Sequence, residues 1–167
     1  SATSSPGLAW AEGFAHWFSS DVRGDATHFD RQLVRGPGTP SVVTVWKDIA
    51  ARTYRVDGRS GAAASAEPAE GILQPLDEDD IAANLWAISR AATGSSPFYR
   101  ALASPRMTTP ALFYGYRSTS TGEVVPVFPD FLDALGCEGV RAADLRAALD
   151  PDNFYPYPDA ARSPRCG

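Results

Sequence analysis

Residues 77–88 read Asp-Glu-Asp-Asp-Ile-Ala-Ala-Asn-Leu-Trp-Ala-Ile and give the clearest helix signal in the chain. Acidic residues in a first helical turn complement the helix dipole, and Ile81 and Leu85 then recur on one helical face. The segment therefore predicts a helix over 77–92 that ends at Gly94. We interpret the acids as a helix start rather than a cation site, because four consecutive acids there cannot all face one ion.

The rest of the chain alternates between helical and strand-like segments. Apolar spacing predicts further helices over 6–18, 97–102, 129–135 and 140–149, and a short helix that begins at Asp25 and carries Phe29 and Leu33. Runs of β-branched and aromatic residues predict strands over 41–46 and 52–57, joined by 48–51, and over 111–117 and 123–128, joined by the polar turn 118–122. A single helix over 46–56 is the alternative to the first hairpin. These segments together predict an α+β fold in which a small antiparallel sheet of two hairpins packs against about five helices, with one disulfide.

Length and composition predict a single domain over 1–167, because one core typically serves a chain of this size. Residues 1–7 are expected to be a flexible lead and 59–71 a surface loop, and Gly36 to Pro40 are expected to end the short helix. The net charge of −5 argues against nucleic acid as a partner, because phosphate binding needs a basic face. The chain has no apolar run long enough to span a membrane.

The two cysteines, Cys137 and Cys166, predict one disulfide that tethers the Pro-rich tail 151–167. Two free thiols in a cytosolic protein are the alternative. Cys137 also follows a glycine at an expected helix start, where a thiol becomes more nucleophilic, but a second cysteine favours a structural half-cystine. The chain begins with small polar residues and no initiator Met, which is typical of a trimmed terminus, so we expect an extracellular or secreted protein.

The sequence predicts no metal site, because it lacks the usual zinc-binding and EF-hand patterns. His16 falls among aromatic residues and is interpreted as a core residue, whereas His28 is expected to be exposed to solvent. The alternative is that the two histidines meet in space, with Asp25 or Asp30 nearby. The tryptophans are interpreted as core anchors; they are Trp10, Trp17, Trp46 and Trp86.

Two short motifs raise a catalytic alternative. The run Tyr-Arg-Val-Asp-Gly-Arg at 54–59 resembles the Y-R-x-D-x-R strand of pertussis- and cholera-toxin-like mono-ADP-ribosyltransferases, and Ser-Thr-Ser at 118–120 is similar to the S-T-S strand of that family. The resemblance implies that Arg55 and Ser118 or Ser120 bind NAD from neighbouring strands. It also implies that Glu138 is the catalytic glutamate, which orients the ribose hydroxyl and stabilises the developing positive charge. The family has Glu or Gln two residues before its glutamate, and Glu138 follows a different pattern.

A third interpretation is a ligand pocket between the helices and curved strands. The aromatic strand residues Tyr54, Tyr114 and Tyr116 would line such a pocket, with Arg55 or Arg117 to hold an anion. The structural alternative is that these aromatic side chains fill the core or one face of the sheet.

The leading functional hypothesis is a secreted, non-catalytic recognition or effector-type protein that binds a protein or small-molecule partner and needs no cofactor. Such a protein should expose an apolar patch with aromatic and arginine side chains. The alternative is an NAD-using mono-ADP-ribosyltransferase or NAD glycohydrolase-like enzyme, with NAD as its cofactor. The oligomeric state stays open.

Overall fold

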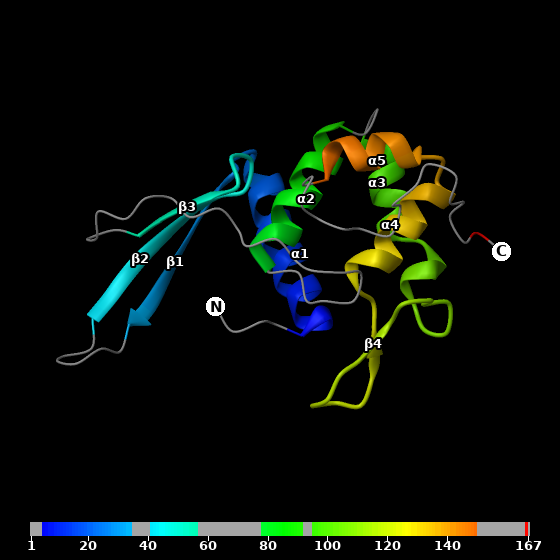
Figure 1. Ribbon diagram of the computed structural model, residues 1–167, viewed down its shortest axis with the longest axis horizontal. Helices are drawn as coiled ribbons and strands as arrows, with labels where there is room; N and C mark the ends of the chain where they lie inside the picture. Colours follow the sequence, from blue (N-terminus) through cyan, green and yellow to red (C-terminus); the bar gives the residue numbers. More distant parts are fainter. Residues whose placement is uncertain (1–4, 35–40, 57–77, 92–94, 150–165, 167) are drawn as a thin grey trace.

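The computed structural model describes residues 5–34, 41–56, 78–91, 95–149 and 166. Within these ranges the chain forms two small antiparallel sheets and five α-helices, which confirms the expected α+β fold. The larger sheet extends from one side of the helices, and the smaller hairpin leaves them at another point (Figure 1). Several predictions concern segments outside the described residues. They are the first part of the flexible lead (1–4), the expected helix end (36–40), the surface loop (59–71) and most of the Pro-rich tail (151–165).

All five helices expected away from the hairpins are present, with shifted ends. They are α1 (Pro6–Arg23), α2 (Glu78–Ala91), α3 (Ser95–Leu102), α4 (Phe128–Cys137) and α5 (Ala142–Ala148), with a single 3₁₀ turn at Pro105–Met107. The helix α1 continues past its expected end at Phe18 as far as Arg23. It ends there because Gly24, with φ of 66°, adopts the left-handed conformation that closes a helix.

The core lies where α1 packs against α2, α3 and α4. Trp17 is fully buried, and its ring centroid lies 4.7 Å from that of Phe98. Helices α1 and α2 approach closely at Gly13, where a Cβ would lie 2.6 Å from the carbonyl oxygen of Glu78. Trp10 and Trp17 are core anchors as expected. The other two tryptophans, Trp46 and Trp86, are only half-buried.

The larger sheet has the order β1-β2-β3 and corrects one prediction. Its strands are β1 (Thr27–Val34), β2 (Ser41–Asp48) and β3 (Thr53–Val56). The second and third strands confirm the first expected hairpin, and the Asp48 carboxylate accepts the N–H groups of Ala50 and Ala51 in its loop. The short helix expected after Asp25 is wrong, because Thr27–Val34 pairs along its whole length with β2. Asp25 caps no helix and instead accepts the N–H of Thr27 over 2.8 Å.

The second expected hairpin is present but shorter. Only β4 (Tyr116–Arg117) and β5 (Val124–Val125) pair, across the expected polar turn. The segment before β4 is held by Asp130 of α4 instead of by a strand partner. This buried carboxylate accepts the N–H groups of Phe113, Tyr114, Gly115 and Val127 at 2.9–3.1 Å.

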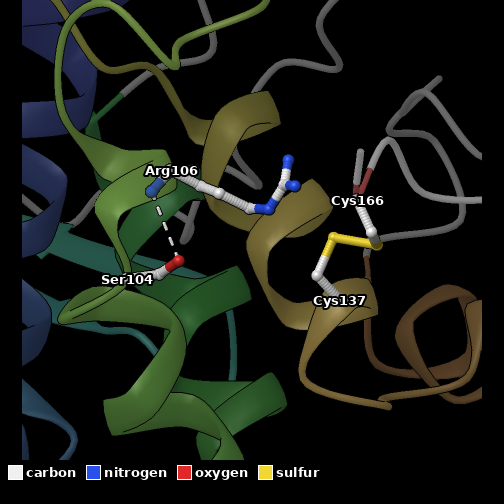
Figure 2. The surroundings of a disulfide bond; sticks show 4 residues. All are labelled: Ser104, Arg106, Cys137 and Cys166. Atoms are coloured by element: carbon white, nitrogen blue, oxygen red, sulfur yellow. Dashed lines mark hydrogen bonds between the residues drawn. A yellow bond between two sulfur atoms is a disulfide. The ribbon is translucent and has the colours of Figure 1, made fainter.

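The expected disulfide joins Cys137 and Cys166, whose Cα atoms lie 5.4 Å apart (Figure 2). The expectation that Cys137 begins a helix is wrong. It is the last residue of α4, because Gly136 lies within the helix and does not end it. A helix C-terminus gives a thiol no help from the helix dipole, so the location and the S–S bond both favour a structural half-cystine.

Candidate functional site

The two faces of the larger sheet have different surroundings. His28, Val45 and Lys47 lie on the face toward the helices, where Val45 and Lys47 are 6% and 7% exposed. Successive side chains along a strand point to opposite faces, so their immediate neighbours in β1 and β2 point away from the helices. Among the described residues, the helices therefore pack against one side of the sheet only.

The open side carries six residues that we call the open strip. They are Phe29, Arg31 and Leu33 of β1 and Val42, Thr44 and Trp46 of β2. The antiparallel register sets them opposite one another in three pairs: Phe29 with Trp46, Arg31 with Thr44, and Leu33 with Val42. The first pair is in ring contact, with centroids 5.3 Å apart.

The apolar side chains of the open strip are unusually exposed for their size. Phe29 is 53% exposed, Leu33 55% and Val42 66%. Single exposed apolar residues are common on protein surfaces, but a contiguous group is typical of a binding surface. Arg31 is exposed among them and is the one ionisable residue of the strip. The open strip thus combines Trp46 and Arg31, two residue types that are enriched among binding hot spots, with exposed apolar side chains that would exclude water around them.

Ion pairs fix the base of the sheet to α2. Lys47 Nζ donates to Asp79 Oδ1 over 2.8 Å and lies 3.6 Å from Glu78 Oε1. In the loop before β3, the Arg52 guanidinium donates to Asp80 Oδ1 over 3.1 Å and to Asn84 Oδ1 over 2.6 Å. The acids at the start of α2 therefore do more than complement its dipole, because they also bind the sheet.

The two histidines meet between α1 and β1, as the alternative interpretation held. The rings of His16 and His28 stack with centroids 4.3 Å apart, and both are half-buried. Their interpretations as a core residue and an exposed residue are therefore both wrong. Burial lowers the pKa of His28, and the positive charges around it, including Lys47, lower it further. At neutral pH this arrangement favours the uncharged imidazole of His28.

His16, Glu78 and Asp79 bring three potential cation ligands within 4.8 Å of one another. The Lys47 ammonium lies against both carboxylates and already supplies a positive charge there. Burial alone would raise the pKa of Asp79, but the neighbouring His16 and Lys47 outweigh it, so the pKa is lowered. The pKa of Glu78 is raised by its hydrogen bond with Glu12 and by burial. We read this cluster as the electrostatic joint between sheet and helices.

The residues of the catalytic alternative lie on different elements. Arg55 is in β3, whose only neighbour in the described sheet is β2, whereas Ser118 follows β4 of the other sheet. Ser118 and Ser120 are hydrogen-bonded to each other over 2.9 Å within their turn. Glu138 caps the end of α4 and accepts from Arg100 Nε over 2.6 Å. The resemblance implied that Arg55 and Ser118 lie on neighbouring strands. In the described sheets they do not, because they belong to different sheets.

The residues expected to line a pocket are divided in the same way. Tyr54 belongs to β3, whereas Tyr114 and Tyr116 precede or begin the small hairpin. Tyr116 packs beside Gly7 of α1, and Arg117 donates to the carbonyl of Gly122 over 2.6 Å in its own turn. Arg117 therefore stabilises the hairpin that contains it.

Sequence reasoning missed the open strip, although one signal was present. Phe29 and Leu33 are four residues apart, a spacing that places two side chains on the same face of a helix and also of a strand. The spacing alone therefore cannot decide between a helix and a strand. The pairing of Thr27–Val34 with β2 decides it, and it places Arg31 on the same face as Phe29 and Leu33.

No protein-family model, curated protein or solved structure matches this chain. Among the described residues, no helix has both the length and the apolar character needed to cross a bilayer. The function is therefore inferred from the chemistry of the described residues.

Proposed function

We propose that this protein is a secreted, non-catalytic recognition protein of the effector type, and that the open strip is its binding surface. The observation that carries the proposal is the exposure of Phe29, Leu33 and Val42 together on one side of a sheet whose other side is packed. Burying a large apolar side chain contributes about 1.5–3 kcal/mol. A partner that covers all three would therefore gain enough to offset much of the entropy of association.

The shape of the region also supports binding. The strands β1 and β2 extend beyond the helices, so a partner can reach the open strip without displacing any described helix (Figure 1). The base of the same strands is fixed by Lys47 and Arg52 to α2. A surface held rigidly loses little entropy when it binds, which favours affinity.

Secretion is supported by the Cys137–Cys166 disulfide, because such bonds persist in oxidising compartments. Cys137 is the last residue of α4, and α4 lies on the other side of α1 from the larger sheet (Figure 1). The bond therefore supports the stability of the protein and takes no direct part in the proposed binding.

Selection of peptides tests the proposed surface without knowledge of the natural partner. A phage-displayed library of random peptides would be selected on the immobilised protein, and the selected peptides would then be measured on Phe29→Ser and Val42→Ser. We expect each change to weaken binding about tenfold or more, the loss of about 1.4 kcal/mol.

The matched control is Val22→Ser, because Val22 is 70% exposed on α1 and lies outside the open strip. It should leave peptide binding unchanged. All three side chains are exposed, so circular dichroism should show that the variants remain folded. Peptides that bind equally well to Phe29→Ser and the unchanged protein would contradict the proposal.

A further inference from the structure

The first strand, β1, forms one edge of the described sheet, because the strand order begins with it. In an antiparallel ladder, directly opposed residues alternate between hydrogen-bonded and non-hydrogen-bonded pairs. Ile49 N–H donates to the carbonyl of Ala26 over 3.2 Å, which assigns Ala26 to a hydrogen-bonded pair. Alternation then directs the backbone groups of Phe29, Arg31 and Leu33 away from β2, toward the edge.

These three residues also supply the β1 half of the open strip. An extended segment lying along β1 would therefore form backbone hydrogen bonds and contact apolar side chains at once. Strand addition to a sheet edge combines these two kinds of contact, with the backbone supplying affinity and alternate side chains supplying specificity.

Charge indicates what such a segment should contain. Arg31 lies in the middle of the β1 half of the strip, and among the described residues no carboxylate pairs with it. The chain as a whole carries a net charge of −5, so this cation stands out against an acidic protein. An arginine beside apolar side chains favours a partner that brings a carboxylate, which its guanidinium can bind with two hydrogen bonds.

We infer that the β1 half of the open strip binds an extended peptide segment that pairs with the edge of β1 as a fourth strand, with apolar side chains beside Phe29 and Leu33 and a carboxylate on Arg31. The inference rests on the proposed function and names the partner of the same surface. A second copy of this chain fits less well. Antiparallel pairing of β1 with itself about its middle places either Asp30 opposite Asp30 or Arg31 opposite Arg31, and like charges directly opposed are destabilising.

The first test repeats the library selection on the unchanged protein and on Arg31→Glu. The unchanged protein should select peptides that alternate apolar residues and are enriched in Asp and Glu, whereas Arg31→Glu should select peptides enriched in Lys and Arg. Acidic peptides should bind Arg31→Glu about tenfold or more weakly. The control is Arg146→Glu on α5, an exposed arginine of another element, which should leave both selections unchanged.

The second test addresses the backbone. A selected acidic peptide would be synthesised in two forms, each with N-methyl groups on alternate amides. The form that blocks the inward-facing amides should lose binding, and the other form should keep it, because only alternate N–H groups of an added strand face β1. Contact through side chains alone would respond equally to the two forms.

The outcomes separate this inference from the proposed function. Peptides that need Phe29 but show no charge preference, or respond equally to both methylated forms, would overturn the inference and leave the proposed function standing. Dimerisation in analytical ultracentrifugation that is lost in Phe29→Ser would also overturn it in favour of a second copy. Peptides that ignore Phe29 and Val42 would overturn both.

Discussion

Lys47, the only lysine in the chain, donates from Nζ to Asp79 Oδ1 over 2.8 Å and so joins β2 to the start of α2. Its side chain is only 9% exposed, and that of Asp79 is 29% exposed. The buried Lys47 ammonium has lost most of its hydration, so it needs the Asp79 carboxylate to offset the free energy of desolvation. The position of the open strip relative to the helices depends on this pair.

We expect Lys47→Met to lower the free energy of unfolding by about 1–2 kcal/mol, because it leaves the half-buried carboxylates of Glu78 and Asp79 without their counter-charge. Urea denaturation followed by tryptophan fluorescence measures the change. Combining Lys47→Met with Asp79→Leu should recover part of the loss, since an apolar pair leaves no isolated charge. A loss in the single variant below about 0.5 kcal/mol would show that the ion pair contributes little.

The stacked histidines predict a loss of stability in mild acid. The pKa of His28 in the folded protein lies below its ordinary value of 6.5, mainly because of burial. The unfolded chain therefore binds a proton more readily, so the stabilisation is complete above 6.5 and is lost as pH falls toward the lowered pKa.

Urea unfolding at pH 7.5 and pH 5.5 checks this expectation. His28→Phe retains a ring that can stack on His16 but cannot be protonated, so its stability should fall less between the two pH values than that of the unchanged protein. An equal fall in both proteins would assign the acid sensitivity to other groups.

The disulfide gives a direct test of the expected export. We expect no reactive thiol in the purified protein without reductant and two thiols after reduction and unfolding. Replacing Cys137 and Cys166 with Ser should lower the free energy of unfolding by about 3–4 kcal/mol, the chain-entropy value for a loop of this length. Reductant should then leave the variant's stability unchanged. Two reactive thiols in the untreated protein would contradict the bond and the proposed compartment.

The close approach of α1 and α2 reverses an ordinary helix preference. Ala usually stabilises a helix by about 1 kcal/mol relative to Gly. At Gly13, however, a Cβ would lie 2.6 Å from the Glu78 carbonyl oxygen and 2.7 Å from Ile81 Cβ. We expect Gly13→Ala to destabilise the protein by about 1–3 kcal/mol in thermal or urea unfolding.

Ala15→Gly is the control for that change, because Ala15 is exposed on the same helix. It should cost about 0.5–1 kcal/mol, the usual penalty for glycine. If Gly13→Ala instead stabilised the protein, the two helices would have room to move apart.

The helices could be predicted because their signals are local. The acids and apolar spacing of α2, and the apolar spacing in the first part of α1, each indicate a helix without reference to the rest of the chain. The disulfide followed from an even count of cysteines. By contrast, β1 could not be told from a helix, because Phe29 and Leu33 fit both periods and its pairing with β2 is non-local.

The same limit applies to the candidate site. Motif reasoning selected Arg55 and Ser118 because each lies in a short familiar run, yet they belong to different sheets. The open strip has no motif. It exists because β1 and β2 align Phe29 with Trp46 on a face that no described helix covers, and only the register reveals that alignment.

Asp130 holds the segment before β4 entirely through main-chain N–H groups, three of them from Phe113 to Gly115. Such an attachment is indifferent to side-chain identity at Phe113 and Tyr114, although it demands a carboxylate at position 130. Phe113, which is 61% exposed, should therefore accept other side chains while the backbone keeps its path. This position is therefore a suitable place to attach a label, because the Asp130 carboxylate holds the backbone on either side of the change.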